Sequence, residues 1–203
     1  MKPETTHHLD KAGATVAEVE NIVDLHEYPD DPRTVLVRGL LAMIVQYHRS
    51  ALLLIKSGFV GPPFVLVRDI LRGTRYGLWI NCATSDQILN IHEEDDFVLS
   101  TEMTKEVEAA YQGDPFFVEL RDRWAAKFNR YLRGKIVRLG QFCIDPKTEL
   151  KLQEEEVGDA VTIATLCIVL LASKFLATQK HAVESKQVEA LATAYQSKAE
   201  TGQ

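Results

Sequence analysis

Apolar side chains recur three and four positions apart along most of the chain, which is the spacing of helices with one buried face. The clearest example follows Asp31, a good helix cap, and Pro32, which suits the first helical position because its missing N–H is not needed there. Gly58 can end this helix in a left-handed conformation. The apolar stripe between these signals is Val37, Leu41, Ile44, His48, Ala51 and Ile55. Its flanks are apolar too, so we expect this helix in the middle of a bundle.

The same reasoning places helices along the rest of the sequence. The predicted ranges are 14–27, 61–82, a short segment from 84 or 85 to the acidic residues 93–96, 101–111, 115–142 and 154–178. Neither a hairpin dipeptide nor a sustained alternation of apolar and polar residues indicates strands. The predicted fold class is therefore all-α, a single helical bundle of about five long helices plus short helices.

The pattern also divides the chain into three parts. Residues 1–12 are predicted to be a polar tail, residues 13–180 an all-α bundle domain, and residues 181–203 a surface helix or loose tail. The longest uncharged stretch, Ala160–Ser173, is shorter than the roughly 20 apolar residues that span a bilayer. It indicates a buried core helix, and we expect no membrane partner.

Composition and charge narrow the function classes. The 203 residues carry a net charge of −6 and are 46% hydrophobic and 26% charged, as in ordinary soluble domains. The acidic balance argues against general coating of nucleic acid, although a local basic patch is compatible with it. Three separated cysteines, Cys82, Cys143 and Cys167, are expected to be buried, reduced thiols, which favours a cytoplasmic location.

The sequence lacks the motifs of several common chemistries. The sequence has no phosphate-binding Gly-x-x-x-x-Gly-Lys loop and no Gly-x-Ser-x-Gly nucleophile turn. The Glu-x-x-His spacing of di-iron bundles occurs only at Glu4 and His7, in the predicted tail. We therefore expect no metal and no cofactor, and the balance is against an enzyme without deciding the matter.

Two features suggest a binding site instead. One is His48 on the apolar stripe, either a hydrogen-bonded core residue or a general base in a buried pocket. The other is a set of arginines three and four residues apart on one helix, together with a segment, 121–138, whose net charge is +6. The cations either pair with the acids at 93–96 and 154–159 or bind an anion. The candidate ligand-binding residues are His48, Arg68, Arg72, Arg75, Trp79, Asn129, Tyr131 and Arg133.

Several short motifs resemble those of a known family. They are His48-Arg49-Ser50-Ala51, Lys56-Ser57-Gly58, Leu66-Val67-Arg68 and Gly77-Leu78-Trp79. This resembles a family of uncharacterised bacterial all-helical proteins with a domain of unknown function, over about residues 36–178. In that family a glutamate follows the arginine and a Tyr-Thr-His-Gly-Gly segment lies on the long helix. Here Arg72 and Arg133 replace the glutamate and the histidine, which puts any shared acid–base chemistry in doubt because arginine stays protonated.

A second all-helical family, the HEPN ribonucleases of bacterial defence, has an arginine followed four to six residues later by a histidine. That spacing does not occur in this sequence. We therefore expect a non-catalytic protein-interaction or self-associating module, with a protein partner or a homodimer. The alternative is an RNA- or phosphate-binding protein, a defence-related nuclease relative without the Arg–His motif, so nucleic acid is the less favoured partner.

Overall fold

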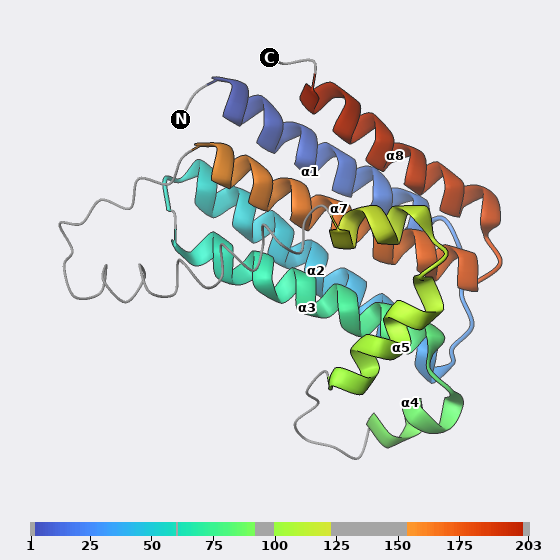
Figure 1. Ribbon diagram of the computed structural model, residues 1–203. Coiled ribbons are helices and arrows are strands. Elements are labelled where there is room, and N and C mark those ends of the chain that lie inside the picture. Colours follow the sequence, from blue (N-terminus) through green and yellow to red (C-terminus); the bar gives the residue numbers. More distant parts are fainter. Residues whose placement is uncertain (1–2, 60, 92–99, 123–153, 201–203) are drawn as a thin grey trace, which may run out of the picture.

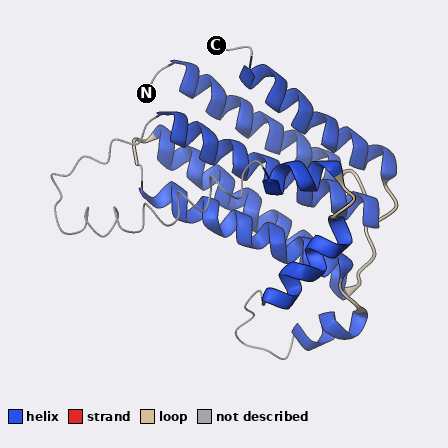
Figure 2. Cartoon of the chain, viewed as in Figure 1, coloured by secondary structure: helices blue, strands red, loops and turns tan. Residues whose placement is uncertain are grey.

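The computed structural model shows an all-α protein, as predicted (Figures 1 and 2). The structure describes residues 3–59, 61–91, 100–122 and 154–200, and these contain no strand. The helices are α1 (Pro3–Asp24), α2 (Pro32–Lys56), α3 (Gly61–Cys82), α4 (Ser85–Ile91), α5 (Thr101–Tyr111), α7 (Glu154–Thr178) and α8 (Ala182–Glu200). A further helical segment covers residues 115–122. The five long helices α1, α2, α3, α7 and α8 run side by side in Figure 1.

Helix α7 is the centre of the bundle and contacts α1, α2, α3 and α8. Every residue of 160–176 except Thr162 is buried, which confirms that the uncharged stretch forms a core helix. Among the described helices it alone, over Glu156–Thr178, is long and apolar enough to cross a membrane, but 89% of its most apolar window is buried inside the protein. Burial of this kind is the pattern of a core helix.

Polar residues cap the starts of several helices, and Asp31 does so as predicted. Asp31 accepts hydrogen bonds from the backbone N–H groups of Arg33 and Thr34 at 3.0 and 3.2 Å, and Pro32 follows it as the first residue of α2. Ser100 accepts from Met103 N at the start of α5. Thr84 and Gln87 exchange side-chain and backbone hydrogen bonds before α4, which is a capping box. These contacts satisfy N–H groups that the helix itself leaves unpaired.

The predicted N-terminal end of the chain needs correction, whereas a helix at the C-terminal end was one of two predicted alternatives. The expected polar tail at residues 1–12 is wrong, because residues 3–12 form the first turns of α1. Leu9 and Ala12 are fully buried and extend the stripe that Val16, Val19 and Val23 continue toward the C-terminus of the helix. At the other end, residues 182–200 form helix α8, the first of the two predicted alternatives, and its Val188 and Tyr195 are buried.

A charged group links the segment 115–122 to the core. Lys174 of α7 pairs with Asp114 at 2.5 Å and with Glu189 of α8 at 2.8 Å, and Asp114 also caps the segment by accepting from Phe117 N. Burial alone would lower the pKa of Lys174, but the two carboxylates outweigh it and raise the pKa above its usual value. Most of the predicted helix at 115–142 lies outside the described residues.

Candidate functional site

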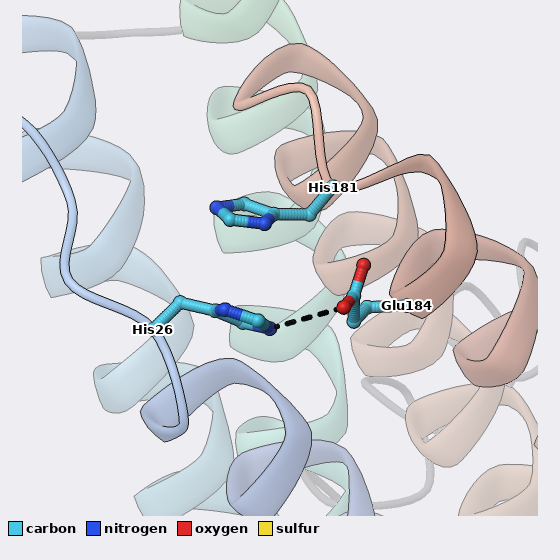
Figure 3. Close-up of side chains that lie close together, drawn as sticks. All are labelled: His26, His181 and Glu184. Carbon is cyan, nitrogen blue, oxygen red and sulfur yellow. Dashed lines mark ion pairs between the residues drawn. The ribbon is translucent and has the colours of Figure 1, made fainter.

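Two histidines and a glutamate meet at one end of the bundle (Figure 3). His26 lies just beyond the C-terminus of α1, His181 directly precedes α8, and Glu184 lies in the first turn of α8. One potential ligand atom from each residue lies within 4.8 Å of those of the other two. All three side chains are partly exposed. We call this group the His–His–Glu cluster.

The turn between α7 and α8 positions two of the three side chains. Lys180 adopts a left-handed conformation, with φ of 67°, and donates its N–H to the carbonyl of Ala177. His181 N donates to Leu176 O at 2.9 Å, which completes a Schellman motif. The reversal that follows starts α8 at once, and the three-residue spacing of a helix then sets Glu184 on the same side as His181.

The geometry within the cluster is close but leaves one atom without a partner. The rings of His26 and His181 stack with their centroids 4.1 Å apart and their planes at 27°. His26 Nε2 lies 3.6 Å from Glu184 Oε1, which is an ion-pair distance if the ring is protonated and is longer than a hydrogen bond. Within the described structure His26 Nε2 is buried and has no hydrogen-bond partner. A buried unpaired nitrogen is costly, so this atom calls for a proton or a cation.

Tyr28 forms the wall behind both imidazoles. Its ring meets His26 and His181 edge-on, with centroids 6.3 and 5.7 Å away, and packs against Phe175 of α7 at 4.9 Å. The hydroxyl donates to Val23 O at 2.7 Å, and burial raises the pKa of Tyr28 to about 12. Tyr28 therefore shapes the cluster as a neutral apolar surface, with its oxygen committed elsewhere.

His48 is buried, as predicted from its apolar stripe, with 1% of its surface exposed. Nε2 lies 3.0 Å from Thr165 Oγ1, and the Thr165 hydroxyl donates to Val161 O. The threonine oxygen therefore accepts from Nε2–H, which makes the unprotonated nitrogen Nδ1, an atom without a partner in the described structure. Burial, with a smaller contribution from Arg49, lowers the pKa of His48 to about 4. This histidine is a neutral group joining α2 to α7.

The predicted arginine stripe lies on α3, but its members differ in environment. Arg68 is more than half covered, with 40% of its side chain exposed, and its Nε lies 3.5 Å from Asp69 Oδ1. Arg72 and Arg75 are exposed. Trp79 is buried and donates from Nε1 to Glu106 Oε2 of α5 at 2.7 Å. The tryptophan therefore joins α3 to α5 and does not form part of an open arginine surface.

The remaining predicted site residues, Asn129, Tyr131 and Arg133, lie outside the described residues. The five candidates that the structure describes differ in burial and in partners, and none of them belongs to the His–His–Glu cluster. A sequence signal for the cluster existed in His181-x-x-Glu184, the reverse of the Glu-x-x-His order that was sought. Of the three expected thiols, Cys167 is buried, Cys82 is exposed and Cys143 is outside the described residues.

Comparisons with known proteins found no relative of this chain. No family model matches the chain, and neither a curated protein nor a solved structure matches it.

Proposed function

We propose that the chain is a non-catalytic module that associates with a second copy of itself through the end of the bundle that carries the His–His–Glu cluster. The observation that supports this is the exposure of Leu25 and Val183, at 77% and 76% the most exposed large apolar side chains in the described residues. Each adjoins a cluster residue in sequence. Covering such side chains is favourable by about 25 cal/mol per Å² of apolar surface.

Opposite charges on the two connections favour a second copy as the partner. The end of α1 and the connection to α2 carry the exposed acids Asp24, Glu27 and Asp30, whereas the α7–α8 turn and the first turns of α8 carry the exposed Lys180 and Lys186. A two-fold axis sets the same surface of both copies face to face. The acidic connection of one copy then meets the basic turn of the other, which makes the surface complementary to itself.

The non-catalytic part of the proposal rests on the polar groups of the core. His48 and Trp79, two of the predicted site residues, are each bonded to a neighbouring helix through Thr165 and Glu106. Groups held in this way contribute to packing and specificity of the bundle. A cytoplasmic location is part of the same proposal, because the thiols of Cys82 and Cys167 are both free.

Sedimentation velocity tests the self-association. We expect the wild-type protein to sediment as a dimer and the variant Leu25→Ser/Val183→Ser as a monomer. Leu53→Ser is the matched control, because Leu53 is 66% exposed near the C-terminal end of α2, at the opposite end of the bundle (Figure 1). A monomeric wild-type protein at its highest soluble concentration, or a double variant as dimeric as the wild type, would contradict the proposal.

An anion-binding role is the alternative, and the exposure of Arg72 and Arg75 on one face of α3 favours it. Arginine forks suit phosphate oxygens. Fluorescence anisotropy with a labelled single-stranded RNA distinguishes the two roles. Salt-sensitive RNA binding by the wild-type protein that is lost in Arg72→Ala/Arg75→Ala would support the alternative. If the wild-type protein does not bind the RNA, self-association remains the proposed function.

A further inference from the structure

We infer that the His–His–Glu cluster binds a divalent transition-metal ion of the zinc class. The inference does not rest on self-association, because all three donors come from one chain. Two imidazoles and a carboxylate are a donor set that zinc accepts in proteins, with one or two further positions left for water. We expected no metal because the sequence shows no Glu-x-x-His spacing on its core helices. That reason no longer holds, because the end of α1 and the start of α8 bring the three donors together in the folded chain.

The distances suit an ion of this kind after small side-chain movements. Zinc bonds to nitrogen and oxygen of about 2.0–2.2 Å in tetrahedral geometry put neighbouring donors about 3.4 Å apart. His26 Nε2 and Glu184 Oε1 are already 3.6 Å apart, and the third donor lies within 4.8 Å of both. The His181 ring must tilt out of its stack to direct a nitrogen at the ion. Its partial exposure, next to the turn at Lys180, leaves room for that rotation.

The unpaired nitrogen is the second argument for a cation. His26 Nε2 is shielded from water and faces a carboxylate oxygen beyond hydrogen-bond distance. A cation between His26 Nε2 and Glu184 Oε1 would accept the lone pair of the imidazole and would also balance the charge of the carboxylate. A proton on His26 would satisfy the same two atoms but would not engage His181. The choice between a proton and a metal ion is therefore what the experiment must decide.

The surroundings are also those of a metal site. The ring of Tyr28 backs both histidines and Phe175 packs behind it, so one side of the cluster is apolar. Such a shell excludes water and strengthens the interaction of an ion with its ligands. The opposite, partly exposed side provides the route by which an ion enters. An ion held there would join the end of α1 to the start of α8, two elements that are distant in sequence.

Isothermal titration with zinc chloride tests the inference on full-length protein whose affinity tag has been removed and whose metals have been stripped with a chelator. We expect one zinc ion per chain. His26→Asn and Glu184→Gln should each weaken binding by at least about 100-fold, since even groups that only orient a ligand are worth 10–100-fold. His7→Asn is the control: His7 is exposed near the start of α1, at the other end of the bundle, and its loss should leave the affinity unchanged.

Cobalt absorption provides a second readout, because it reports the coordination of the bound ion in the wild-type protein directly. Co²⁺ bound by two imidazoles and a carboxylate gives the visible bands of a four- or five-coordinate ion, and His181→Asn should abolish them. Absence of zinc binding to the wild-type protein, or equal affinity in His26→Asn and wild type, would overturn the inference. Either result is independent of whether the protein sediments as a monomer or a dimer.

Discussion

At the scale of single residues, two turns with the same hydrogen bonds show what sequence can and cannot predict. Phe59 N donates to Leu54 O after α2 and His181 N donates to Leu176 O after α7, so both helices end in a Schellman motif. The left-handed residue is Gly58 in the first, with φ of 84°, and Lys180 in the second. The left-handed conformation of Gly58 was predictable from the sequence, because glycine adopts it readily. That of Lys180 was not, because residues other than Gly and Asn rarely adopt it.

Replacing Lys180 with glycine should therefore stabilise the protein. A left-handed conformation costs a residue with a Cβ atom about 1 kcal/mol, and glycine escapes that cost. We expect Lys180→Gly to raise the free energy of unfolding by about 1 kcal/mol in urea denaturation. Gly58→Ala should lower it by about the same amount. An unchanged or lower value for Lys180→Gly would mean that contacts of the lysine side chain offset the strain of its backbone.

At the scale of helices, the hydrophobic pattern predicted most elements and their ends, because caps and prolines are local signals. The start of α1 is not evident from the sequence because residues 4–8 are all polar, although Leu9 and Ala12 continue the three-and-four spacing of the rest of the helix. The closeness of neighbouring helices could not be predicted either. A Cβ atom on Gly73 would lie 2.5 Å from Ile44 of α2, and one on Gly77 would lie 2.5 Å from Leu171 of α7. These glycines let α3 approach both neighbours.

Two glycine-to-alanine changes should therefore have opposite effects. Gly77→Ala places a methyl group against Leu171, which is fully buried and has little room to move, and overpacking costs about 1–3 kcal/mol. The gain in helix propensity of about 1 kcal/mol offsets part of it, so we expect a net loss of about 1 kcal/mol. Gly39 in α2 is exposed, and a Cβ there would meet nothing within 4 Å. Gly39→Ala should gain about 1 kcal/mol, and thermal melts of the two variants that shift in the same direction would contradict this account.

At the scale of the whole molecule, the candidate site shows why a single sequence predicts helices better than sites. His26 and Glu184 belong to opposite ends of the chain, and only the docking of α1 and α8 on α7 brings them together. The arginine stripe on α3 was visible because its members share one helix. Their environments nevertheless differ, because Trp79 is buried and bonded to Glu106 of α5, whereas Arg72 and Arg75 are exposed. Local spacing therefore identified residue types, and the packing of the bundle decided which of them meet.

The buried His48 makes the whole fold sensitive to acid. Its pKa is about 4 in the folded protein and about 6.5 in an unfolded chain, so between these values only the unfolded state takes up the proton. The stabilising contribution of neutral His48 is thus fully present above about pH 6.5 and is lost as the pH falls toward 4. At 1.36 kcal/mol per pKa unit the total loss is about 3 kcal/mol. Burial also lowers the pKa of His8, which adds a loss of the same sign.

A variant comparison isolates the contribution of His48 from that of His8 and the acids. We expect His48→Gln to be less stable than wild type at neutral pH, because an amide fills the site imperfectly and the bond to Thr165 is altered. Between about pH 6.5 and 4 it should then lose about 3 kcal/mol less than the wild type does. Urea denaturation followed by circular dichroism at a series of pH values measures this difference. His7→Gln, a change at an exposed histidine, should keep the wild-type slope. Parallel curves for wild type and His48→Gln would show that the pKa of His48 is the same in the folded and unfolded states, and the lowered pKa of the buried histidine would then be wrong.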